Sequence, residues 1–306
     1  QWRNRRFDSG RRVPTRVDVP VVSVGNITTG GTGKTPVVEW VARRLRDWQR
    51  RVVIISRGYG AEAGAQNDEA IELEQSLPDV PHLQNPKRVE AATVAVKELA
   101  CECIVLDDGF QHRQLGRDLD IVLLDALEPF GFQHLLPRGV LREPLHNLAR
   151  ADWVGLSRAD LVDRARRKEI REQVARFAPQ ARWFELSHKP MHWENAAGEC
   201  LPLSELLDRR LFAFCGIGNP DGFRQTLEHL DLDVRDLQVF PDHHAYCRED
   251  VEALVDRVES TSDAAFVCTR KDLVKLMIDQ IGSVPLWSLR IGIEFQEGED
   301  ALESDL

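Results

Sequence analysis

Short hydrophobic runs alternate with helical patterns along the first half of the chain. The runs are rich in β-branched residues and cover 19–25, 52–56, 103–107, 121–125, 153–156 and 183–186. Runs of this length without polar alternation are typical of strands buried on both faces. Apolar positions recur at helical spacing between them, over 34–48, 68–77, 86–99 and 163–177. Strands and helices in alternation predict a parallel sheet with right-handed crossovers.

A second and shorter series follows. Its predicted strands are 211–215, 234–239, 264–269 and 284–286, and its predicted helices are 221–230, 249–258 and 272–278. The stretch 188–202 between the two series contains Pro190, Gly198 and Pro202 and has little periodicity. We therefore expect one α/β domain over residues 1–187, and a linker with a second, smaller α/β domain over residues 188–306.

A glycine-rich turn joins the first predicted strand to the first predicted helix. Its sequence is Thr28-Thr29-Gly30-Gly31-Thr32-Gly33-Lys34-Thr35, in which Thr28 replaces the usual first glycine of a phosphate loop. Backbone N–H groups of such a turn converge on an anion, Lys34 reaches terminal phosphates and the Thr35 hydroxyl can bind Mg²⁺. The pattern predicts a P-loop NTPase-like sheet domain. The predicted nucleotide-binding residues are Gly30, Gly31, Thr32, Gly33, Lys34 and Thr35.

Two adjacent carboxylates, Asp107 and Asp108, end the predicted strand 103–107. Acids at the carboxyl end of a buried strand stay charged most easily beside a cation, as in the Walker B position of P-loop enzymes. A polar strand end that faces a loop is the alternative. The segment Gly-Phe-Gln-His-Arg that follows at 109–113 is unusual for a plain turn. We predict that Thr35, Asp107 and Asp108 bind the Mg²⁺ ion of a nucleotide.

Three further clusters could serve phosphoryl transfer, which needs cations at the phosphates and a group that orients or deprotonates the acceptor. Asp68 and Glu69 open a predicted helix after the glycine-rich segment 56–60. Arg142 and Glu143 lie in the proline-bounded loop 137–144, and Asp-His-His stands at 242–244. The alternatives are helix N-terminal charges, a local ion pair and a metal site, respectively. For 242–244 a structural or catalytic histidine is favoured over zinc, because no third ligand at suitable spacing is evident.

Two segments loosely resemble the [NT]-K-x-D guanine-binding motif of GTPases. They are Ser-Arg-Ala-Asp at 157–160 and Thr-Arg-Lys-Asp at 269–272, each after an apolar strand. Neither fits the motif fully, because Arg158 and Arg270 replace its lysine. We favour helix-capping and strand-exit roles for both segments.

Composition and charge narrow the classes of function. The 306 residues are 42% hydrophobic and 29% charged, as in ordinary globular proteins, and no apolar run approaches the ~18 residues that cross a bilayer. A net charge of −10 argues against a nucleic-acid partner. The six cysteines form no C-x-x-C pair and indicate a reducing compartment without disulfides.

The charge is unevenly spread. Six arginines lie within the first sixteen residues beside Trp2 and Phe7, whereas the last residues are acidic. Arginines interleaved with aromatic residues are attracted to an anionic membrane surface. A solvated, frayed terminus is the alternative interpretation of this segment.

Taken together, these segments resemble the tetraacyldisaccharide 4'-kinase family, the lipid A 4'-kinases of Gram-negative envelope biosynthesis. The resemblance runs from Val21 to about Phe295. It is carried by the segments 23–26 (Ser-Val-Gly-Asn), 30–36 (Gly-Gly-Thr-Gly-Lys-Thr-Pro), 56–60 (Ser-Arg-Gly-Tyr-Gly), 68–69 (Asp-Glu), 107–112 (Asp-Asp-Gly-Phe-Gln-His), 136–145, 216–220 (Gly-Ile-Gly-Asn-Pro), 242–244 (Asp-His-His) and 269–272 (Thr-Arg-Lys-Asp). The segments 107–112 and 242–244 are the specific ones, whereas the phosphate loop alone would indicate only a superfamily.

The resemblance implies an enzyme that transfers the γ-phosphate of ATP, with Mg²⁺, to the 4'-hydroxyl of a tetraacylated glucosamine disaccharide 1-phosphate. It also implies two α/β/α units joined by a two-stranded linker, and peripheral binding to the anionic surface of the inner membrane at its cytoplasmic face. In such enzymes a basic and apolar N-terminal helix holds the membrane, so residues 2–16 would be the remaining end of that helix. No obligate protein partner is expected.

The resemblance also implies roles for individual residues. Lys34 and Thr35 would bind phosphate and Mg²⁺, and Asp107 and Asp108 would bind the metal. Asp68 would be the base toward the acceptor hydroxyl, in a dyad with one histidine of the Asp242-His243-His244 turn of the other domain. The residues that would contact the acceptor are Tyr59, Glu69, Arg142 and Glu143.

Some positions depart from the family pattern. Asn67 stands where a glycine usually precedes Asp-Glu, Gly-Phe-Gln at 131–133 replaces a glycine-asparagine turn, and the segment 61–66 is short. These departures affect substrate loops, so they concern acyl-chain and sugar preference more than phosphoryl transfer.

Two other hypotheses compete with the lipid kinase. One is a P-loop GTPase or ATPase switch of the metal-insertase type, which the Asp-His-His turn and the two guanine-motif segments would serve. The other is a kinase for a small soluble substrate. Preference for ATP or GTP separates the switch from the kinases, and dependence of activity on detergent separates the two kinases.

Overall fold

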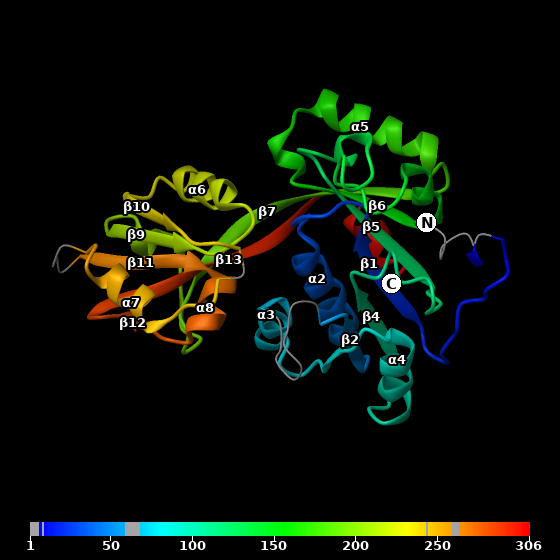
Figure 1. The fold of residues 1–306 in the computed structure, drawn as a ribbon, viewed down its shortest axis with the longest axis horizontal. Coiled ribbons are helices and arrows are strands. Elements are labelled where there is room, and N and C mark those ends of the chain that lie inside the picture. Colours follow the sequence, from blue (N-terminus) through cyan, green and yellow to red (C-terminus); the bar gives the residue numbers. More distant parts are fainter. Residues whose placement is uncertain (1–5, 8, 59–67, 243, 259–262) are drawn as a thin grey trace. The chain divides into compact units, whose positions relative to one another are not determined.

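The computed structural model describes residues 6–7, 9–58, 68–242, 244–258 and 263–306. The chain divides into two compact units, one made of Gln1–His188 with Ile293–Leu306 and the other of Lys189–Gly292 (Figure 1). Among the described residues, no helix has the length and apolar character needed to cross a bilayer.

A parallel sheet forms the centre of the first unit, with the strand order β7-β6-β5-β1-β4-β2-β3. Its strands are β1 (Val21–Asn26), β2 (Val52–Ser56), β3 (His82–Gln84), β4 (Cys103–Asp107), β5 (Leu119–Asp125), β6 (Trp153–Ser157) and β7 (Arg182–Glu194). Every residue of β1, β2, β4 and β6 is buried, as expected of strands covered on both faces. The predicted P-loop NTPase-like α/β fold is confirmed.

Helices cover both faces of this sheet. They are α2 (Lys34–Asp47), α3 (Asp68–Ser76), α4 (Arg88–Lys97), α5 (Arg164–Phe177) and α9 (Glu299–Glu303). Val37 and Val41 of α2 pack with alternate strand residues such as Val24 on one face, in the same core as α9. Ala92 of α4 and Ile170 of α5 pack on the opposite strand faces. The sheet is therefore doubly wound, and its carboxyl edge is the place for a ligand.

The second unit is a smaller α/β unit with the parallel strand order β10-β9-β11-β13. Its strands are β9 (Arg210–Cys215), β10 (Val234–Val239), β11 (Ala264–Thr269) and β13 (Val284–Glu297), with short antiparallel additions β8 (Cys200–Leu201) and β12 (Gln280–Ile281). Its helices are α6 (Pro220–His229), α7 (Arg248–Val255) and α8 (Arg270–Leu276). Separate apolar cores lie on the α6 side and on the α7 and α8 side of the sheet.

Two strands, β7 and β13, each pass from one unit into the other and are neighbours in the sheet order. The sequence predicts only their first few residues, 183–186 and 284–286, because the apolar runs end there.

The expected second domain ran to residue 306, whereas residues 293–306 belong to the first unit. Leu302 is fully buried in the core that contains α2. The Trp153 indole donates to Asp305 at 2.9 Å, and Arg44 of α2 donates to Glu299 at 3.3 Å. The acidic end of the sequence therefore packs against basic and aromatic side chains of the first unit.

Candidate active site

The phosphate loop lies between β1 and α2 at the carboxyl edge of the first sheet. Gly33 immediately precedes α2 and has a φ of 72°, in the left-handed region that glycine adopts without strain. The buried Thr32 hydroxyl accepts a hydrogen bond of 3.0 Å from the Asn26 amide. A Cβ at Gly30 or Gly31 would meet nothing within 4 Å. The turn is thus fixed from β1 and open on the side of these glycines, as an anion site built from backbone N–H groups requires.

Three predicted site residues meet beside this loop. The Arg142 guanidinium donates from one nitrogen to both carboxylate oxygens of Asp108, at 2.7 and 2.8 Å. Lys34 Nζ lies 3.9 Å from the same carboxylate, and its side chain is only 14% exposed. Asp108 therefore holds two cations at the end of β4, next to the open glycine turn. Such a pair of cations can stabilise charge on a transferred phosphate.

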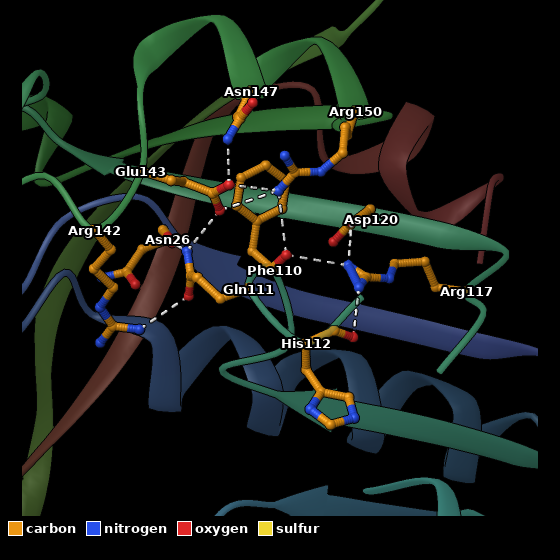
Figure 2. A network of polar contacts seen from close by, with 10 residues as sticks. All are labelled: Asn26, Phe110, Gln111, His112, Arg117, Asp120, Arg142, Glu143, Asn147 and Arg150. Atoms are coloured by element: carbon orange, nitrogen blue, oxygen red, sulfur yellow. Dashed lines mark hydrogen bonds and ion pairs between the residues drawn. The ribbon is translucent and has the colours of Figure 1, made fainter. Parts of the chain in front are cut away.

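Glu143 follows Arg142 in sequence, and Arg150, Asn147 and Gln111 surround its carboxylate, as Figure 2 shows. It is 3% exposed, and Arg150 donates to both of its oxygens at 3.0 Å. Asn147 donates to Oε2 at 2.6 Å and Gln111 donates to Oε1 at 3.0 Å. Four hydrogen bonds thus compensate a buried carboxylate. This arrangement favours a positioning role for Glu143 within the loop over direct contact with a substrate.

Gln111 connects the two halves of this network. Its amide nitrogen also donates to the Asn26 carbonyl at 2.7 Å, while its amide oxygen accepts from Arg142 at 3.1 Å (Figure 2). Arg150 lies over the Phe110 ring, with its guanidinium carbon 4.2 Å from the centroid. The segment 109–113, unusual as a plain turn, therefore holds the strand end after Asp108 against β1 and against the Arg142 loop.

Arg117 fixes the same turn from the other side. It donates to the His112 carbonyl at 2.8 Å and to the buried Asp120 carboxylate at 2.8 Å (Figure 2). Burial raises the pKa of Asp120 to about 6, although Arg117 opposes the shift.

The residues predicted to bind Mg²⁺ fit that ion by their chemistry. Asp107 is buried at the end of β4, Asp108 follows it, and Thr35 lies in the first turn of α2. Mg²⁺ prefers oxygen ligands and is usually held by one or two carboxylates together with substrate phosphates and water. No group of three His, Cys, Asp or Glu side chains that could hold a metal alone occurs in the part of the chain that the structure describes. A site completed by nucleotide phosphates matches this set.

Four predicted residues are only partly described or not described. Asp68 and Glu69 begin α3, as the sequence predicts, but their side chains lie outside the description. Tyr59 and His243 lie outside the described residues altogether. Their roles stay predictions.

His244 is held within the second unit. Its ring stacks on Phe240, with centroids 4.8 Å apart, and meets the Tyr246 ring edge-on. Its Nε2 is 2.8 Å from an oxygen of Asp250, at the start of α7. The hydrogen bond from the Cys247 backbone N–H lowers the pKa of Asp250 to about 2, and the hydrogen bond with His244 makes a smaller contribution in the same direction. His244 thus links the Asp-His-His turn to α7.

The second guanine-motif segment has an internal role. Asp272 is fully buried, and its Oδ1 accepts from the Gly216 N–H at 2.9 Å and from the Tyr246 hydroxyl at 2.8 Å. The Thr269 hydroxyl donates to Oδ2 at 2.6 Å. A carboxylate with these partners fastens two loops of its own unit, so a role in reading a guanine base is not supported.

Comparison with known proteins agrees with this geometry. The family model described as LpxK, Tetraacyldisaccharide-1-P 4'-kinase, matches residues 1–306. The chain belongs to this family.

Curated relatives and a solved structure support the LpxK assignment over nearly the whole chain. The tetraacyldisaccharide 4'-kinase of Anaeromyxobacter sp. (strain K) is 41% identical over 98% of this chain and 84% of its own length. That of Halothermothrix orenii is 36% identical over 88% and 77% of the two chains. The crystal structure of LpxK from Aquifex aeolicus in complex with ATP has a TM-score of 0.79 and 30% identity, and covers 99% of this chain and 92% of that chain.

Membership of the LpxK family makes this chain a kinase and confirms the resemblance seen in the sequence. The alternative of a metal-insertase GTPase is not supported, because the family match covers the whole chain and Asp272 is engaged internally.

Sequence reasoning missed two residues of the polar network beside the phosphate loop, Asn147 and Arg150, which surround Glu143. Both lie in the turn 145–150 just after the conspicuous Arg-Glu-Pro. The available signal was weak: an arginine seven positions after a glutamate has no motif, and only the fold brings the two together.

Proposed function

We propose that this chain transfers the γ-phosphate of ATP to the 4'-hydroxyl of a tetraacylated glucosamine disaccharide 1-phosphate. The observation that carries the proposal is the meeting of Lys34, Asp108 and Arg142 beside an open glycine turn, in a chain that the LpxK family matches throughout. Phosphoryl transfer depends on positioning and on charge stabilisation, and this arrangement offers both.

Different residues of the site would bind the phosphates and the Mg²⁺ ion. Backbone N–H groups of the phosphate loop and Lys34 bind the phosphates, and Arg142 adds positive charge at the terminal phosphate. Thr35, Asp107 and Asp108 would hold Mg²⁺, which supplies Lewis-acid neutralisation of the phosphate oxygens when bound. Asp108 lies between both cations, at 2.7 Å from Arg142 and 3.9 Å from Lys34.

The assay that tests the proposal uses the purified chain with radiolabelled ATP, Mg²⁺ and the tetraacyldisaccharide 1-phosphate in detergent micelles. Label is expected to enter the lipid, with ATP preferred over GTP. The Lys34→Ala variant serves as the blank. A chain that binds ATP but transfers no label to the lipid would refute the proposed acceptor. Equal labelling from GTP would refute the proposed donor.

We further propose Asp68 as the base toward the acceptor hydroxyl, in a dyad with His243. His244 supports this choice indirectly, because its Nε2 is engaged by Asp250 and its ring by Phe240. General-base catalysis of this kind contributes roughly 10² to 10⁴ in rate.

A double mutant tests the dyad. If the two residues act as one unit, Asp68→Ala with His243→Ala loses no more kcat than the poorer single variant, and the KM for ATP moves little. Losses that multiply would refute a shared role. His244→Ala is the matched control, and a larger loss for it than for His243→Ala would reverse the assignment.

We propose peripheral binding at the cytoplasmic face of the inner membrane. Four described arginines of the N-terminal segment are exposed: Arg6, Arg11, Arg12 and Arg16. The neighbouring Phe7 ring is buried, with the guanidinium carbons of Arg12 and Arg113 at 5.4 and 5.2 Å from its centroid. The segment is therefore tied to the first unit with its charges outward, and each basic side chain near an anionic surface contributes about 1 kcal/mol.

Flotation with anionic vesicles tests membrane binding. The full chain is expected to float with them and to be released by high salt, and deletion of residues 1–12 is expected to weaken flotation. Neutral vesicles are the control. Flotation that depends on neither lipid charge nor this segment would contradict the proposal.

A further inference from the structure

Three strands flank the phosphate loop on the side away from β4. In the sheet order, β5 is the neighbour of β1 opposite β4, and β6 and β7 follow it. They bring together Asp125 at the end of β5, Ser157 at the end of β6 with the next residue Arg158, and His188 within β7. We call these four residues the loop clamp. The sequence did not single out Asp125 or His188, and it drew attention to Ser157 and Arg158 only for a loose likeness to a guanine-binding motif.

Arg158 joins the clamp to the phosphate loop. One guanidinium nitrogen pairs with the Asp125 carboxylate, and another donates to the Gly31 carbonyl at 2.7 Å. Asp125 also accepts from the Leu127 backbone N–H at 3.1 Å, so its carboxylate is fixed from its own loop. Arg158 has a φ of 56°, in the left-handed region that strains a residue with a side chain. Backbone strain of this kind persists where a side chain must be aimed at a particular point.

His188 contacts the loop at a second glycine. Its ring lies against Gly33, so close that a Cβ at Gly33 would overlap the ring atoms Cε1 and Nε2 and would lie 3.0 Å from the Ser157 hydroxyl. The His188 Nε2 is 3.3 Å from that hydroxyl. Gly33 directly precedes Lys34, so this contact sets the backbone from which Lys34 extends.

The charge state of His188 suits this contact. Burial, with a smaller contribution from the Arg158 charge, lowers the pKa of His188 to about 4. The ring is therefore neutral near pH 7 and does not repel the arginine beside it.

We propose that the loop clamp positions the phosphate loop for ATP: Arg158 holds the Gly31 carbonyl, and His188 with Ser157 holds Gly33. A carbonyl oxygen turned toward a phosphate would repel it, whereas a carbonyl tied to the flank leaves the N–H groups of the turn to face the anion. These are positioning residues, because they act through the loop backbone. The inference rests on ATP as the nucleotide of the proposed function.

The clamp also accounts for the segment 157–160. The guanidinium nitrogens of Arg158 bond to Gly31 and to Asp125, so this arginine contacts the phosphate loop and not a nucleotide base. A base-reading role would show itself as a change in the preference for ATP over GTP.

The experiment measures binding of a fluorescent ATP analogue and steady-state kinetics on the full chain. Arg158→Ala is expected to raise the Kd and the KM for ATP at least about tenfold, with the KM for the lipid within about twofold. Arg158→Lys is expected to behave like the alanine variant, because one ammonium cannot span both partners as the guanidinium fork does. Arg166→Ala, which removes an exposed arginine paired with Glu169, is the matched control and is expected to match wild type.

Chemical rescue separates positioning from general loss of structure. Added guanidinium at non-denaturing concentration is expected to restore part of the ATP affinity of Arg158→Ala, whereas methylammonium is not. Asp125→Asn removes the negative charge that pairs with Arg158 and is expected to raise the Kd for ATP. Combining it with Arg158→Ala is expected to raise the Kd little further than Arg158→Ala alone. These arms keep the proposal testable if one variant folds poorly.

Several outcomes would overturn the clamp. They are an unchanged Kd for ATP in folded Arg158→Ala, a change confined to the lipid KM, or a shift in the preference between ATP and GTP. Binding of the ATP analogue does not require phosphate transfer. A chain that binds ATP through the clamp but labels no lipid would refute the proposed acceptor alone, so the two failures are distinguishable.

Discussion

Replacing Arg150 by methionine should destabilise the first unit strongly. Glu143 is 3% exposed, and Arg150 supplies two of its four hydrogen bonds, both 3.0 Å long. Each hydrogen bond to a buried charge contributes about 1.5–3 kcal/mol. Removing one partner of a buried pair costs about 3–5 kcal/mol, because the remaining carboxylate stays buried. We therefore expect the free energy of unfolding to fall by about 3–5 kcal/mol.

Denaturant unfolding followed by tryptophan fluorescence measures this loss. The double variant Glu143→Gln with Arg150→Met removes the stranded charge and is expected to recover at least about 2 kcal/mol relative to Arg150→Met alone. Arg166→Met is the control, since its ion pair with Glu169 is exposed and contributes at most about 1 kcal/mol. A loss below about 1 kcal/mol for Arg150→Met, or simple addition of the two single losses, would refute the argument.

Three further predictions concern charge at the site. Lys34→Ala should lower kcat at least about 100-fold in the lipid-labelling assay with little change in melting temperature, because this lysine acts on phosphate charge; near wild-type turnover would contradict its role. Asp107→Asn and Asp108→Asn should each raise the Mg²⁺ concentration needed for half-maximal rate, measured by Mg²⁺ titration, and an unchanged titration would make the acids structural. Burial lowers the pKa of His188 to about 4 from an ordinary 6.5, so its contribution to stability is complete above pH 6.5 and is lost as the pH falls toward 4. The free energy of unfolding should fall less between pH 7 and pH 4 in His188→Gln than in wild type, by about 3 kcal/mol. The remaining fall includes that of His82, whose pKa is also lowered to about 4 by burial.

Most strands of the first sheet could be predicted because they are continuous apolar runs in the sequence. The bounds of β2 and β4 match the expected runs, since strands buried on both faces need apolar residues at every position. The short β3 carries the half-buried residues His82, Leu83 and Gln84 and has no such signal. The later halves of β7 and β13 were missed because polar and apolar residues mix where these strands pass from one unit into the other.

The candidate site could be predicted where its residues are contiguous in sequence and form a recognisable motif. The glycine turn, Asp107-Asp108 and Arg142-Glu143 were found this way, and the structure places Lys34, Asp108 and Arg142 together. The partners that orient them were not predictable. Arg150 and Arg158 act through long side chains that reach residues distant in sequence, and arginines on a surface look the same in the sequence as arginines in a network.

The position of residues 293–306 has a consequence for how the chain folds. Leu302 completes a core whose other members include Val37 and Val24, more than two hundred residues earlier. During synthesis, residues 189–292 emerge before that last piece, so the inserted unit can fold while the phosphate-loop unit still lacks α9. Contacts so far apart in sequence form late and slow the folding of the unit that contains them. The first unit therefore starts to emerge before the second unit and is completed after it.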